Sequence, residues 1–194
     1  MVFPKAPAQK TFTYESKIPQ SVAFVLWKTA GIRGNITEFR RLNILAEILS
    51  DRLREEIREK LGTSYSPNAG ASGSDGLDDF GYVICESVGK PGDLPVLLET
   101  LRREADELAR KGATADELDR ALKPTLGMLD KTLRDNTYWL NTVLSRSQAE
   151  PQRLDYARKR DADYKSINLK EINALAAKYL PSGKAIQVSI KPEE

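Results

Sequence analysis

The sequence predicts an α+β fold in which an antiparallel or mixed sheet of about five strands carries packed helices, and three observations support it. Short apolar or alternating runs, typical of strands, occur at residues 10–15, 21–29, 63–70, 79–88 and 186–190. Longer segments with apolar residues at helical spacing lie between them. The order is two strands, a long helix, two strands, a block of helices and one strand, which indicates α+β rather than alternating α/β.

The first predicted helix is the longest. Asn35 and Glu38 form an N-cap pair, and Gly62 is well placed just after the helix end. Between them a wide apolar stripe repeats at helical spacing. It consists of Phe39, Leu42, Ile44, Leu45, Ala46, Ile48, Leu49, Leu53, Ile57 and Leu61.

The block of helices has its own start and stop signals. Asp93 is expected to cap a helix that Gly112 ends, and Thr114 with Glu117 forms a capping box for the next. Further helices are expected at 137–148 and 152–165 and after Asn168 with Glu171. The helix after Thr114 is expected to bury Leu118, Leu122, Leu126, Leu129 and Leu133.

Length and composition are those of one self-sufficient domain. The chain has 194 residues, 40% of them hydrophobic and 30% charged. A chain of this size buries roughly 70% of its unfolded surface, so its core needs no metal or disulfide. We expect a single α+β domain over residues 10–194. Residues 1–9, rich in proline and alanine, are expected to be an interdomain linker or the cut end of a longer protein.

The charge balance argues against some partners. Thirty basic and 28 acidic residues give a net charge of +2, too small to indicate nucleic-acid binding. The cluster Arg158-Lys159-Arg160 is interspersed with acidic residues, which predicts a solvated helix face. No apolar stretch approaches the ~20 residues that a membrane span needs.

Several catalytic classes are excluded because the chain has no histidine and one cysteine. These counts rule out Ser-His-Asp and Cys-His arrangements and thiolate zinc clusters. Cys85 lies in an apolar run, where a buried inert thiol is expected. We therefore predict no metal site in this chain, and we assign it no catalytic residue, because a pair of catalytic carboxylates cannot be chosen among 28 acidic residues from the sequence alone.

The junction after the long helix holds the candidate site, formed by Arg58 and Tyr65. Each residue has an ordinary structural explanation. A cation in the last helical turn is favoured by the helix dipole, and a strand tyrosine usually packs. The two stand seven positions apart, with Leu61-Gly62 between them.

This junction resembles a substrate-holding motif of the insulinase/pitrilysin family of zinc metallopeptidases, and it stands in the right order with other segments that resemble the same family. Other similar segments are Asp79-Phe80-Gly81-Tyr82, Thr114-Ala115-Asp116-Glu117-Leu118, Asn136-Thr137-Tyr138-Trp139-Leu140 and Ala176-Ala177-Lys178-Tyr179-Leu180. The bacterial members related to the coenzyme-biosynthesis type of zinc protease look most similar. The family's His-x-x-Glu-His motif has no counterpart here, because histidine is absent.

The resemblance implies the C-terminal, non-zinc half of a two-part peptidase. Arg58 and Tyr65 would then contact the peptide substrate or its transition state. Zinc would be held by a homologous N-terminal domain in cis or in trans. The isolated chain would be inactive, and it would expose an apolar or mixed surface and self-associate.

Two other classes of function stay open at this point. One is an inactive peptidase-like scaffold or interaction domain of a larger assembly. The other is an unrelated peptide- or ligand-binding α+β domain. The sequence does not separate a periplasmic from a cytoplasmic location.

Overall fold

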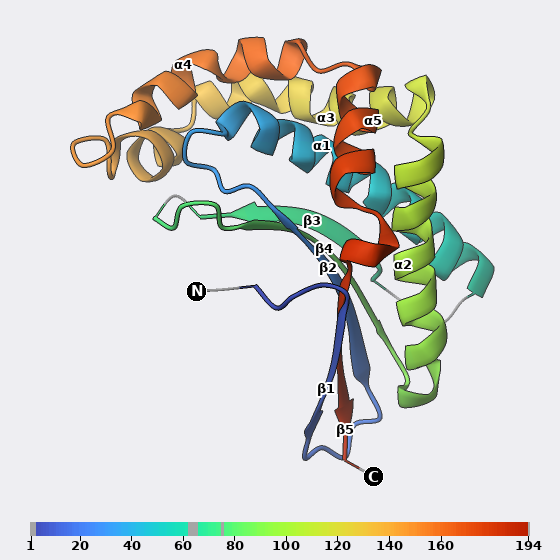
Figure 1. Ribbon diagram of the computed structural model, residues 1–194. Helices are drawn as coiled ribbons and strands as arrows, with labels where there is room; N and C mark the ends of the chain where they lie inside the picture. The colour runs from blue at the N-terminus through green and yellow to red at the C-terminus, as the bar shows by residue number, and fades with distance from the viewer. Residues whose placement is uncertain (1–2, 62–65, 75, 194) are drawn as a thin grey trace.

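A computed structural model of the chain describes residues 3–61, 66–74 and 76–193, and gives the backbone only for residues 58–61. Five strands form one sheet with a set of helices against it (Figure 1). The strands are β1 (Ala8–Tyr14), β2 (Ser21–Thr29), β3 (Asn68–Gly73), β4 (Gly81–Gly89) and β5 (Ile186–Pro192). The helices are α1 (Ile36–Leu53), α2 (Leu94–Lys111), α3 (Ala115–Leu133), α4 (Gln152–Lys165) and α5 (Leu169–Tyr179), with π-helices η1 (Arg54–Leu61) and η3 (Tyr138–Leu144) and 3-10 turns η2 (Pro91–Asp93) and η4 (Ser182–Lys184).

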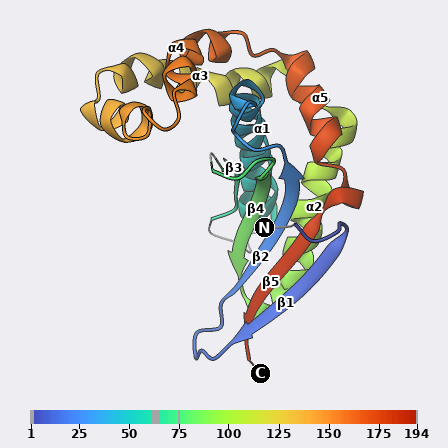
Figure 2. The same ribbon diagram turned by 60° about the vertical axis from the view of Figure 1, so that its left-hand side comes forward.

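The sheet has the strand order β1-β5-β2-β4-β3, with β1 and β3 at its edges (Figure 2). The β1–β5 pair is parallel, whereas β2 pairs antiparallel with both β4 and β5, and β3 pairs antiparallel with β4. The predicted α+β class with a mixed five-stranded sheet is therefore confirmed. The chain returns from its last helix to place β5 between the first two strands.

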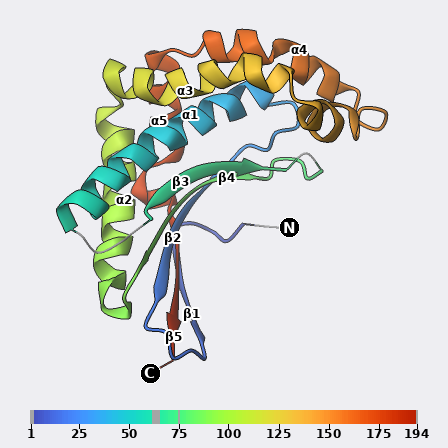
Figure 3. The same ribbon diagram turned by 180° about the vertical axis from the view of Figure 1, so that it is seen from behind.

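The core lies between one face of the sheet and the helices α1, α2 and α5. Alternate residues of β2, namely Ala23, Val25 and Trp27, are fully buried. They pack in one cluster with Leu45 and Leu49 of α1, which the stripe predicted. Figures 1 and 3 show these helices on one side of the sheet, with the N-terminal segment on the other. Among the described residues, no helix covers the other face of the sheet.

The long helix extends as far as predicted, although it changes type. The α-helix α1 is followed directly by the π-helix η1, which ends at Leu61. Leu53 and Ile57 are both fully buried, so the apolar stripe continues across the change. Gly62, the expected C-terminal cap, lies outside the described residues.

The third strand was predicted too early. Residues 63–65 of the predicted 63–70 strand lie outside the described residues, and β3 begins only at Asn68. It continues to Gly73, beyond the predicted end at residue 70. A Cβ atom at Gly73 would lie 2.8 Å from Cγ1 of Ile32, so a side chain here would require a shift. The glycine is explained by close approach within a strand rather than by flexibility.

All four residues predicted to cap helices lie at the N-cap position, but only two of them make a side-chain capping hydrogen bond. Thr114 accepts a hydrogen bond from the Glu117 amide, and Asn168 accepts one from the Glu171 amide. Asn35 precedes α1 but makes no side-chain capping bond. The carboxylate of Asp93 accepts instead from the Lys90 amide, which caps the short turn η2 before α2.

The segments α3, η3 and α4, here called the helical arm, extend past the sheet edge (Figure 1). The expectation that Leu133 is buried was wrong, since 44% of its surface is exposed, whereas Leu129 is buried. The expectation of a fully solvated Arg158–Arg160 cluster was wrong for Arg160, whose Nη1 atom is buried. Both differences arise because the arm has its own packing, which helical periodicity and charge order do not show.

Candidate functional site

The candidate site lies where the long helix ends at the sheet's edge strand. Arg58 belongs to η1, and its side chain lies outside what the structure describes. Tyr65 lies outside the described residues altogether. The structure therefore places the helix that carries Arg58, and the proposed pairing of the two side chains stays a prediction.

The helical side of this junction is held by the core and by α2. Ile57, next to Arg58, is fully buried. Nη2 of Arg103 on α2 donates to Oε1 of Glu56 at 2.6 Å. The backbone that carries Arg58 is thus fixed by an apolar anchor and a charged hydrogen bond, which suits a residue that must hold one position.

On the strand side of the junction, β3 is hydrogen-bonded to α1. The Ser50 hydroxyl of α1 donates to Oδ1 of Asn68, the first residue of β3, at 3.1 Å. Pro67, just before the strand, is buried. β3 therefore begins beside α1, the helix that leads directly into η1 and Arg58.

A partly buried ion pair also holds the α2–α3 turn against the end of α1. Nε and Nη2 of Arg52 donate to the two carboxylate oxygens of Glu117 at 2.6 and 3.0 Å. Nη2 of Arg52 also donates to the Gly112 carbonyl at 3.0 Å. Burial alone would raise the pKa of Glu117, but hydrogen bonds from Arg52 and Thr114 outweigh it and lower that pKa to about 2. The pair therefore stays charged at neutral pH.

The residues present do not fit a zinc ion. Among residues 3–61, 66–74 and 76–193, no three carboxylate, cysteine or histidine side chains gather where they could hold a metal. Cys85 is fully buried, and burial raises the pKa of its thiol, so it is a poor thiolate ligand. Within that same part of the chain, no helix is both long and apolar enough to cross a bilayer.

Sequence reasoning missed a second region, two adjoining hollows in the helical arm. One is lined mainly by apolar side chains around Trp139, and the other by three arginines of which Arg160 is shared by both. The sequence signal that could have found this region is the adjacent pair of aromatic residues Tyr138 and Trp139. In the structure Tyr138 is half-buried and Trp139 is exposed. Trp139 keeps 37% of its surface exposed.

Comparison with known proteins links this arrangement to one family. Residues 2–124 match the family described as Peptidase M16 inactive domain. An uncharacterized zinc protease of Streptomyces coelicolor is 33% identical over 96 residues, which cover 49% of this chain and 20% of that protein.

Solved structures agree with this fold. An M16-like peptidase from Alicyclobacillus acidocaldarius superposes with a TM-score of 0.78 at 15% identity, over 97% of this chain and 44% of that one. The inactive peptidase domain of a zinc protease from Bordetella parapertussis gives a TM-score of 0.75 at 20% identity, over 93% of this chain and 95% of that one. Since the family match spans more than half of the chain, the protein belongs to the M16 peptidase inactive-domain family.

Proposed function

We propose that this chain is the substrate-binding half of a zinc-dependent metallopeptidase, and that a zinc-binding half in cis or in trans completes the enzyme. The observation that carries the proposal is an M16 inactive domain in a chain without any histidine. Such a chain cannot supply the His-x-x-Glu-His ligands. Its contribution to peptide cleavage would be to bind and orient the substrate.

The exposed surface supports a partner on the open side of the sheet. Phe12 and Tyr14 of β1 are 46% and 37% exposed, and Leu133, Leu140 and Leu144 of the arm are 44%, 61% and 50% exposed. The open sheet face and the arm meet in a concave corner, and the N-terminal segment runs into it (Figure 1). A preceding domain or a partner subunit placed there would cover part of this exposed apolar surface.

Arg58 and Tyr65 are the side chains that we propose to reach the peptide. An arginine fork and a phenol hydroxyl both donate hydrogen bonds, which suits a peptide carbonyl or the oxyanion formed when water attacks it. The hydrogen bonds of Glu56 and Asn68 described above would fix the backbone on both sides of this site. Preorganised donors favour the transition state because they need not move as charge develops.

The metal content of the purified chain tests this division of labour. After dialysis against metal-free buffer we expect far less than one zinc per chain, measured by atomic emission, and no cleavage of a casein or peptide library. Stoichiometric zinc, or cleavage that a chelator abolishes, would show that the chain has catalytic chemistry of its own.

A further inference from the structure

A cavity between the start of α1 and the helical arm, here called the arginine cavity, has a volume of about 410 Å³. Three arginines line it, Arg40 from α1 with Arg153 and Arg160 from α4, together with the rings of Tyr138 and Tyr156. Among the described residues, no acidic side chain lines it. The charged side chains in its lining are therefore all arginines, set mainly among apolar and aromatic residues.

Two of the three arginines pair with carboxylates that do not line the cavity. Arg40 forms a buried ion pair with Asp163 and donates to the Tyr156 carbonyl at 2.6 Å. Nε of Arg153 donates to Glu150 at 2.7 Å, and hydrogen bonding from Arg153 lowers the pKa of that carboxyl. The charge of Arg40 is thus compensated, and that of Arg153 is partly compensated because Glu150 also pairs with Arg146. Arg160 is the member of the set that pairs with no carboxylate among the described residues.

Arg160 has no such partner among the described residues. Its guanidinium carbon lies 5.0 Å from the ring centroid of Tyr138, and its Nη1 atom is buried without a hydrogen-bond acceptor. An unpaired charged donor is costly to bury. Water would satisfy the hydrogen bond but not the charge, so the group best suited to this position is an anion.

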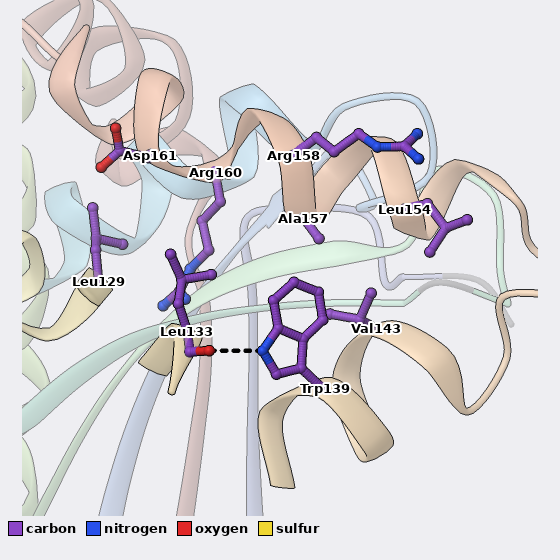
Figure 4. A pocket seen from close by; sticks show the side chains of 9 residues that line it. All are labelled: Leu129, Leu133, Trp139, Val143, Leu154, Ala157, Arg158, Arg160 and Asp161. Atoms are coloured by element: carbon purple, nitrogen blue, oxygen red, sulfur yellow. Dashed lines mark hydrogen bonds between the residues drawn. The ribbon is translucent and has the colours of Figure 1, made fainter. Parts of the chain in front are cut away.

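An apolar pocket adjoins the cavity on the other side of Arg160. It has a volume of about 430 Å³ and shares Val143, Ala157 and Arg160 with the arginine cavity. Figure 4 shows the indole of Trp139 and the side chain of Leu133 facing into it. The indole Nε1 donates to the Leu133 carbonyl at 2.8 Å, so the ring is fixed as a wall of the pocket.

We propose that the two hollows together bind a peptide segment in which a carboxylate side chain lies next to an apolar one. The carboxylate would pair with Arg160 in the arginine cavity, and the apolar side chain would pack against Trp139. Taking the ligand to be a peptide rests on the proposed function. The arm then provides a docking point on elements other than η1, with a preference for acidic-apolar sequence.

Titration of the isolated, ¹⁵N-labelled chain with a capped tetrapeptide of alternating glutamate and leucine tests the proposal by NMR. The indole signal of Trp139 should shift, and that of Trp27, which is fully buried in the core, should not. The same peptide with glutamine in place of glutamate should bind about tenfold more weakly, as expected when a charged hydrogen bond is lost. Octanoate, an aliphatic acid without a peptide backbone, should bind more weakly than the glutamate peptide.

Two matched variants locate the charge. Arg160→Gln should reduce the preference for glutamate over glutamine to about twofold or less, since the charged partner is gone. Lys159→Gln, on the same helix, removes an exposed cation that lines neither hollow, and should leave the preference unchanged. An unshifted Trp27 signal in Arg160→Gln shows that the core is intact.

Equal affinity of the wild-type chain for the two peptides would overturn the proposal without reference to any variant. So would an unmoved Trp139 signal, equal losses in the two variants, or octanoate binding as tightly as the peptide. The titration needs neither zinc nor a second domain. A failure of the peptidase proposal, seen as zinc in this chain, is therefore distinguishable from a failure here.

Discussion

Arg58→Lys and Tyr65→Phe are each expected to lower kcat/KM of the assembled peptidase by about 10- to 1,000-fold, as loss of a transition-state donor does. Lysine keeps the positive charge but loses the planar fork, and phenylalanine loses only the hydroxyl. If both side chains hold the same peptide group, the double variant should be non-additive. Steady-state kinetics with one fluorogenic peptide measures all three variants.

The control for this experiment is Arg54→Lys, one turn earlier on the same helix. Arg54 is exposed and pairs with Asp51 at 2.6 Å, so its replacement should leave kcat/KM nearly unchanged. The melting temperatures of all variants should stay close to that of the wild type, because surface changes usually alter stability by about 0.5 kcal/mol or less. Normal turnover with a large loss of stability would make Arg58 and Tyr65 fold residues.

Gly81→Ala is expected to have the largest effect on folding, about 3 kcal/mol or more of lost stability. Gly81 opens β4, where a Cβ atom would lie only 2.1 Å from the carbonyl oxygen of Ala30. That oxygen belongs to the backbone that leads from β2 toward α1, so relief requires a shift of the main chain. Urea denaturation monitored by circular dichroism measures the loss.

Gly70→Ala is the matched control for this substitution. Gly70 lies in the neighbouring strand β3, and a Cβ atom there would meet nothing within 4 Å. Its replacement should change the free energy of unfolding by no more than about 1 kcal/mol. Any change should be a gain in stability, because alanine lowers the conformational entropy of the unfolded chain. Equal effects of the two substitutions would contradict the close approach at Gly81.

Much of the fold follows from pattern because large apolar residues mark it. The strand predicted at 21–29 agrees with β2 at both ends, and the leucine stripe of the long helix is buried. β3 was misplaced because its residues, Asn68 to Gly73, are mostly small and lack the β-branched signal. Its position is set by pairing with β4 and by packing against α1, which a local pattern cannot contain.

The two candidate sites differ in how they could be found. Arg58 and Tyr65 followed only from resemblance, since an arginine near a helix end and a strand tyrosine have common structural roles. Arg160 looked like one of three solvated cations, because sequence shows the charges beside it and not the ring of Tyr138 beneath it. Burial of a single guanidinium nitrogen is a tertiary property, and only the packed arm reveals it.

The most direct measurement of the proposed division of labour is peptide cleavage by the zinc-binding half with and without this chain. We expect neither half alone to cleave a fluorogenic peptide, and the mixture to do so with a rate that saturates as this chain is added. Full cleavage by the zinc-binding half alone would contradict a substrate-binding role and would assign this chain to a scaffold.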